Sequence, residues 1–190
     1  MRFRPALLTL ALLALPAAAR AQATPAQPAS PAAQRPAARP EDVASVDAII
    51  TALYAVISGP PGQARDWDRM RSLFQPDARM EPIVPRRQGG GFEVRVLAPD
   101  DYVQRSGEML TRFGFTEKEI ARRQERFGNL VHVWSTYEGR FTGEGAPTKD
   151  AIRGINSIQL AWDGTRWWIL NLAWDSERPG SALPPEYLPR

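Results

Sequence analysis

The chain has 190 residues, of which 43% are hydrophobic and 24% charged, values ordinary for one globular domain. It contains no cysteine, which excludes disulfides, thiol catalysis and cysteine-based metal sites. Five of its 24 basic residues precede the first acidic residue, Glu41, and removing them leaves 19 basic against 21 acidic side chains. The net charge of +3 therefore belongs to the N-terminal segment, and the composition gives no support to nucleic-acid binding.

Residues 1–21 have the three parts of a secretory signal peptide. Arg2 and Arg4 form a basic start, an apolar run follows, and small residues end at Ala21. The apolar run is shorter than the roughly 20 residues that span a bilayer. The sequence predicts cleavage after Ala21 and a periplasmic or secreted protein with no membrane association after cleavage. A short buried helix is the alternative interpretation of this run.

Residues 22–40 consist almost entirely of alanine, proline and glutamine. Such a segment has few side chains that could bury surface, and its prolines favour extended conformations. We expect a disordered spacer over 22–40, followed by one folded domain over 41–190.

Three helices are predicted in the first half of this domain. Apolar residues recur at three- and four-residue steps over residues 41–58, and Gly59-Pro60-Pro61-Gly62 ends that pattern. Residues 66–74 form a second, shorter amphipathic segment. A third helix is expected over residues 100–113, with Gly114 as its cap.

Strands are predicted around and after the third helix. Residues 78–84 and 92–97 flank a glycine-rich loop and form a pair. Residues 116–127 have helix-forming composition, but the Gly128-Asn129 turn that follows favours the first arm of a hairpin, so we predict a strand there. The glutamates and arginines of this segment, Glu117 and Glu119 among them, have the pattern of a solvated face of mixed charge.

The C-terminal third predicts a hairpin with a tight Asp163-Gly164 turn between residues 151–162 and 165–175. Strict alternation would place Trp168, Leu170, Leu172 and Trp174 on one face of the last strand, and Trp167, Ile169, Asn171, Ala173 and Asp175 on the other. Both faces are largely apolar, so both should be covered. We expect helices on one face and a second copy of the chain, forming a homodimer, on the other.

Three segments resemble the nuclear transport factor 2-like superfamily, and within it the bacterial SnoaL-like proteins: residues 66–78, residues 127–138 and residues 167–175. The resemblance covers residues 41 to about 177. It implies an α+β cone, in which two to three N-terminal helices pack on a strongly curved, mainly antiparallel sheet with a pocket at the open end. It also implies frequent dimers through the sheet. Because the superfamily includes isomerases, dehydratases, cyclases and non-enzymatic binding modules, the fold specifies no reaction.

His132 is the only histidine, and Asp175 lies at the end of the last predicted strand. The resemblance implies that such a pair could perform proton transfer in the pocket. The alternative is a hydrogen-bonded histidine beside the sheet and a strand-end aspartate, since alternation does not reveal which face points into the cone. A single histidine without cysteine makes a metal site an unfavourable interpretation, and no cofactor is predicted.

Aromatic residues that could form the wall of a pocket for a flat apolar ligand are Tyr54, Trp134, Tyr137, Trp168 and Trp174. Filling of a core or a dimer interface is the alternative for each. Asn171, an amide in an apolar strand, needs a hydrogen-bonding partner if it is buried, and a ligand is one candidate.

The preferred interpretation is an exported, dimeric domain that binds a small, largely apolar molecule and to which the sequence assigns no reaction. One alternative is a pocket lyase or isomerase that uses His132 and Asp175. The other is an envelope protein–protein interaction module without a ligand. An open aromatic pocket without a His132–Asp175 pair would favour binding, whereas a closed, filled cone would favour the interaction module.

Overall fold

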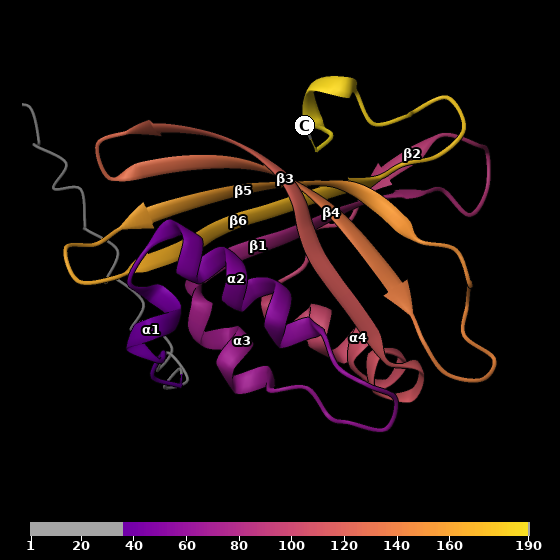
Figure 1. The fold of residues 1–190 in the computed structure, drawn as a ribbon, viewed down its shortest axis with the longest axis horizontal. Helices are drawn as coiled ribbons and strands as arrows, with labels where there is room; N and C mark the ends of the chain where they lie inside the picture. Colours follow the sequence, from indigo (N-terminus) through magenta and orange to yellow (C-terminus); the bar gives the residue numbers. More distant parts are fainter. Residues whose placement is uncertain (1–35, 190) are drawn as a thin grey trace, which may run out of the picture. The chain divides into compact units, whose positions relative to one another are not determined.

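A curved sheet of six strands forms the centre of the domain, and the α-helices lie together on one side of it (Figure 1). The computed structural model describes residues 36–189. The predicted signal peptide and most of the predicted spacer lie outside the described residues. The strands are β1 (Phe74–Pro85), β2 (Phe92–Val94), β3 (Phe115–Phe127), β4 (Leu130–Phe141), β5 (Ile152–Trp162) and β6 (Trp167–Ser176).

The sheet has the order β2-β1-β6-β5-β4-β3. All neighbours pair antiparallel except β1 and β6, which run parallel and join the first strand to the last. The α+β class and the mainly antiparallel sheet predicted from sequence are therefore confirmed.

The described residues form four α-helices and one short 3₁₀ helix. They are α1 (Pro40–Val43), α2 (Val46–Ile57), α3 (Trp67–Leu73), α4 (Pro99–Phe113) and η1 (Pro185–Tyr187). In the part of the chain that the structure describes, no helix is long and apolar enough to cross a membrane.

The predicted first helix is interrupted, which corrects the expectation of one helix over residues 41–58. Ser45 has extended backbone angles, and its hydroxyl accepts a hydrogen bond from the Ala48 amide 3.0 Å away. Serine is among the preferred residues for this N-cap role, and the cap starts α2 anew. The interruption leaves α1 as a separate turn of helix.

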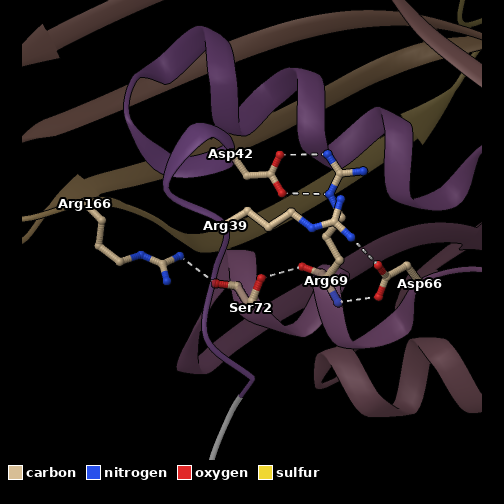
Figure 2. A network of polar contacts seen from close by, with 6 residues as sticks. All are labelled: Arg39, Asp42, Asp66, Arg69, Ser72 and Arg166. Atoms are coloured by element: carbon tan, nitrogen blue, oxygen red, sulfur yellow. Dashed lines mark hydrogen bonds and ion pairs between the residues drawn. The ribbon is translucent and has the colours of Figure 1, made fainter.

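α1 is attached to α3 by a buried ion pair. Asp42 is only 5% exposed, and its carboxylate accepts two hydrogen bonds of 2.7 Å from the Arg69 guanidinium. Arg39 bonds Asp66, the residue that caps α3, and Arg166 of the β5–β6 loop donates to the Ser72 carbonyl (Figure 2). This network connects the start of the domain to α3 and to one end of the sheet.

Residues 115–127 form the long edge strand β3, so the strand prediction for this segment is confirmed. The β5–β6 turn differs from its prediction by one residue. Trp162 pairs with Trp167, and the Asp163 amide donates to the Arg166 carbonyl, so Gly164 and Thr165 occupy the turn. The Asp163 carboxylate accepts from the Thr165 and Arg166 amides, which fixes this position.

A β-bulge in β6 changes which residues share a face. Ile169 is opposite Leu160 and Asn171 is opposite Gln159, so Leu170 is an extra residue without a partner in β5. Trp167 and Ile169 consequently lie on the same, inner face as Leu172 and Trp174, and all four belong to the core or pack against it. The strict alternation predicted for this strand is wrong.

The core lies between the inner face of the sheet and the helices α2 and α3. Side chains from both layers are fully buried there: Ile49, Ile50, Met70, Leu73, Phe74, Val131, Val133, Ile158, Leu160 and Ile169. The C-terminal segment after β6 lies on the other side of the sheet (Figure 1). There the Thr136 hydroxyl donates to the Tyr187 carbonyl at 2.7 Å, and the Tyr187 ring packs edge-on against Trp134.

Candidate functional site

A cavity of about 230 Å³ opens between the inner face of the sheet and the helices α2 and α4. Most of its lining is aliphatic or aromatic: Leu53, Tyr54, Ile57, Met70, Met80, Tyr102, Met109, Leu110, Phe115, Tyr137, Phe141, Ile152, Leu172 and Trp174. The remaining lining residues are polar: Ser106, Glu117, Asn156 and Ser176. A concave apolar site with a few convergent polar groups is typical of small-molecule pockets.

Glu117 supplies the only ionisable carboxyl among the described residues that line the cavity. It follows Phe115 by two positions on β3 and therefore points to the same, inner face. Its partner across the strand pair is Gly139, where a Cβ would lie 2.7 Å from the Phe115 ring. The absence of a side chain at position 139 thus leaves room for Phe115 beside the carboxyl.

Burial raises the pKa of Glu117 from 4.5 to about 7, and a hydrogen bond from Asn156 opposes this rise. Loss of hydration disfavours the charged form of a carboxyl, which explains the direction. Glu117 has no ion pair within residues 36–189. A carboxyl with this pKa changes charge near neutral pH.

A chain of hydrogen bonds connects Glu117 to a second glutamate on the same strand. The Asn156 side-chain amide bonds Glu117 and donates to the Tyr54 hydroxyl at 3.1 Å. Tyr54 lies 2.6 Å from the Ser135 hydroxyl, which donates to Glu119. The chain has a carboxylate at each end, and it orients Asn156 toward Glu117 and fixes the polar end of the cavity.

Two further tyrosine hydroxyls belong to the cavity. Tyr137 Oη lies 2.9 Å from Ser176 Oγ, and burial raises the pKa of Tyr137 to about 12. Burial also raises the pKa of Tyr102, whose ring stands at 83° to the Trp174 ring with 6.1 Å between centroids. Both hydroxyls are therefore neutral at physiological pH and can donate hydrogen bonds.

None of the described residues that line the cavity is lysine, arginine or histidine. Within residues 36–189 there is also no group of three or more histidine, aspartate and glutamate side chains placed to bind a metal ion. The cavity thus has negative or neutral character and lacks a basic group that would attract an anion.

Arg65 connects two walls of the cavity outside its lining. The residue is 6% exposed, and its guanidinium donates to the Ile57 carbonyl at the end of α2 at 3.0 Å and to the Gly59 carbonyl in the following loop at 2.7 Å. It also donates to the Leu110 carbonyl in α4 at 2.8 Å. These bonds hold α4, which carries Tyr102 and Met109, against the loop that follows α2.

Three of the residues predicted to line a pocket do line this cavity. Tyr54 comes from α2, Tyr137 from β4 and Trp174 from β6. The bulge at Leu170 brings Trp174 to the same face as Tyr137, whereas uninterrupted alternation from the buried Trp167 would have directed it outward.

His132 and Asp175 are not brought together. His132 pairs with Gln159, whereas Asp175 pairs with Ile155, which lies four residues further along β5, or about 13 Å. His132 Nε2 lies 2.9 Å from Ser157 Oγ, and Asp175 accepts a 2.5 Å bond from Arg178. Neither lines the cavity, so the structure does not assemble the predicted pair.

Trp134, Trp168 and Asn171 likewise lie on the outer face of the sheet. Trp134 is 38% exposed and contacts Tyr187, while Trp168 donates its indole N–H to Asp163 and stacks on Arg166. Asn171 is opposite Gln159 on one side and opposite Arg79 on the other. For Asn171 the bulge is the physical reason, because it separates the face of Asn171 from that of Ile169. Trp134 lies three positions from Tyr137 on β4, so strand alternation places these two side chains on opposite faces.

The functional residues that sequence reasoning missed are Glu117, Asn156 and Tyr102. Glu117 belongs to a segment rich in charges, which predicted a solvated face. The available signal was its two-residue spacing from Phe115, an aromatic residue at the start of a strand. Such a spacing places both side chains on one face.

No protein-family model and no curated protein matches the sequence. Solved structures do match in fold. A structure described as the crystal structure of LinA is 12% identical with a TM-score of 0.52, covering 75% of this chain and 92% of that one. A putative calcium/calmodulin dependent protein kinase II association domain from Xanthomonas campestris is 16% identical with a TM-score of 0.50, covering 74% and 86%.

A third match is an NTF-2 like protein of unknown function from Silicibacter pomeroyi DSS-3, with 12% identity, a TM-score of 0.44 and coverage of 70% and 94%. At such identities the likeness concerns the fold and carries no activity. Helices on one face of a curved, mostly antiparallel sheet, together with the first two matches, give the chain the nuclear transport factor 2-like fold that its sequence resembles.

Proposed function

We propose that this domain binds a compact, mainly apolar small molecule in the cavity between α2, α4 and the sheet. The observation that carries the proposal is an open cavity of about 230 Å³ with an aromatic and aliphatic lining and one carboxyl. A protein that used the fold only as an interaction module would need no such open space. The hydrogen-bonded chain from Glu117 to Tyr54 gives the cavity one polar end, which would orient the ligand.

A variant that fills the cavity tests this proposal. Ser106 on α4 lines the cavity, so Ser106→Phe would place a ring in the space for the ligand. Gln104→Phe is the matched control, because residue 104 is exposed on the same helix. Ligands found by calorimetry should raise the unfolding temperature of the native chain and of Gln104→Phe. They should leave the unfolding temperature of Ser106→Phe unchanged. Equal ligand binding by both variants would exclude this cavity as the site.

Proton transfer at Glu117 is the second candidate function. It is favoured by a carboxyl with a pKa of about 7, beside the hydroxyls of Tyr102 and Tyr137 that could stabilise a developing oxyanion. A lyase or isomerase of this kind would use Glu117 where sequence reasoning proposed His132 and Asp175. Glu117→Gln should abolish turnover of any substrate, while Glu108→Gln on the exposed side of α4 should not. Full turnover by Glu117→Gln would remove this candidate.

We also propose that the protein is exported and that it dimerises through the outer face of the sheet. The basic, apolar and small-residue parts of residues 1–21 support export, and the partly exposed Trp134 supports an outer contact. A mature N-terminus at Gln22 in the periplasm or medium is the expected result for export. A monomer at micromolar concentration in size-exclusion chromatography would contradict the dimer.

A further inference from the structure

We infer that the ligand is a cation: an ammonium group with hydrocarbon substituents, recognised by Glu117 and by the aromatic rings around it. The inference rests on the proposed binding function and names the chemical class of its ligand. It follows from the carboxyl and the aromatic rings that line the cavity, and from the absence of basic side chains among the described lining residues.

The charge of the cavity favours a cation. Glu117 points into an apolar cavity without an ion pair among the described residues, and no basic residue lines that cavity. An anionic ligand would add a second negative charge there, and a neutral hydrocarbon would leave the carboxylate without a counter-ion. A cationic ligand supplies the counter-ion that the residues described here do not.

The aromatic lining of the cavity also favours a cation. Rings from five elements surround the cavity: Tyr54, Tyr102, Phe115, Tyr137, Phe141 and Trp174. Tyr102 and Trp174 stand almost at right angles, so the two rings form a corner. Ring faces attract cations within about 6 Å of the centroid, most strongly where water is excluded, and recognition of alkylated ammonium ions uses such surroundings.

The volume of the cavity limits the size of the ligand. A cavity of about 150 Å³ holds benzene, so the 230 Å³ available here suits a ligand of about nine non-hydrogen atoms by the same proportion. Met109 lines the cavity and is 39% exposed, so the cavity opens beside α4 and a slightly longer substituent can reach solvent.

The ligand's affinity should depend on pH through Glu117. The ionisable groups that face it are Tyr54 from α2, Tyr102 from α4 and Tyr137 from β4, all with raised pKa values and hence neutral between pH 5.5 and 8. Glu119, next on the inner face of β3, is paired with Arg122, which also bonds Asp47 of α2. Asn156 and Ser176 of β5 and β6 do not titrate.

Three probes of nearly equal size separate charge from shape. Phenyltrimethylammonium carries a cation, tert-butylbenzene is its neutral carbon isostere, and phenylacetate is an anion. Binding to the purified full chain is measured by calorimetry and by thermal shift at pH 5.5 and pH 8. With a pKa near 7, Glu117 is ionised to about 3% at pH 5.5 and about 90% at pH 8.

At pH 8 the cation should bind at least tenfold more tightly than tert-butylbenzene, and phenylacetate should not bind. The affinity for the cation should fall about 30-fold from pH 8 to pH 5.5, in proportion to the ionised fraction of Glu117. The affinity for tert-butylbenzene should not fall over this range. In Glu117→Gln the preference for the cation and its pH dependence should both vanish while tert-butylbenzene still binds, and Glu108→Gln should behave as the native chain does.

Two results would overturn the inference alone: tert-butylbenzene binding as tightly as the cation at pH 8, or unchanged cation binding by Glu117→Gln. In both cases a ligand still enters the cavity, so the proposed binding function survives. If none of the three probes binds the native chain at either pH, the inference and the binding function fail together.

Discussion

Replacement of Glu117 by glutamine should change how the stability of the domain depends on pH. The folded-state pKa of about 7 lies above the ordinary value of 4.5, so the folded state binds more protons than the unfolded state between these values. The free energy of unfolding contributed by this group is therefore fully present below pH 4.5 and is lost as pH rises toward 7. Glutamine does not titrate, so the variant should lack this loss.

The magnitude follows from the two pKa values. At about 1.36 kcal/mol for each pH unit, a rise from 4.5 to about 7 corresponds to about 3 kcal/mol of lost stability above pH 7. Water in the open cavity makes this an upper value. Between pH 5 and pH 8, the stability of Glu117→Gln relative to the native chain should therefore increase by up to about 2.5 kcal/mol.

Urea unfolding followed by tryptophan fluorescence at pH 5, 6, 7 and 8 measures this difference. Other titrating groups contribute equally to both proteins and cancel in the comparison. Glu108→Gln, at an exposed position on α4, should run parallel to the native chain. The reasoning is refuted if the free energy of unfolding of Glu117→Gln differs from that of the native chain by the same amount at every pH from 5 to 8. The pKa of the carboxyl would then be the same in the folded and the unfolded state.

Three further predictions concern the surrounding structure. Asp42→Asn should lower the free energy of unfolding by about 2 kcal/mol near pH 7 and by less at acid pH, since Arg69 lowers the pKa of Asp42; urea titrations at pH 7 and 3 check this. Tyr187→Ala should speed proteolysis of the C-terminal segment, and equal cleavage rates would deny that the contact of the Tyr187 ring with Trp134 holds this segment on the sheet. Asp163→Ala should lower the unfolding temperature in calorimetry, because two turn amides lose their acceptor.

Much of the element order could be predicted from the sequence because turns and caps are local. Gly114, with a positive φ of 62°, ends α4, and the Gly128-Asn129 turn follows β3. The interruption at Ser45 was missed because the apolar stripe continues across it, and a serine inside such a stripe is compatible with a continuous helix. Whether the serine caps a new helix depends on the packing of α1 against Arg69, which is a tertiary contact.

The faces of β6 and the site could not be predicted for a related reason. Once one side chain of a strand is known to point inward, strict alternation assigns the face of every other residue in that strand. The single extra residue at Leu170 therefore reverses the assigned face of all residues after it. The parallel pairing of β1 with β6 joins segments about 90 residues apart and has no local signal. Tyr54 and Trp174 were found because large aromatic residues are conspicuous, whereas Glu117 resembled its solvated neighbours.

The position of Glu117 is hard to explain by stability. At pH 8 its carboxylate costs the fold up to about 3 kcal/mol, whereas an uncharged side chain on the same face of β3 would cost nothing of this kind. The structure nevertheless directs Asn156 toward it through Tyr54 and Ser135, and leaves position 139 without a side chain beside it. Groups that reduce stability and yet are held in place by their neighbours concentrate at functional sites. This arrangement supports the proposal that Glu117 pairs with a cationic ligand, and the charge of the ligand is the property that binding experiments should test first.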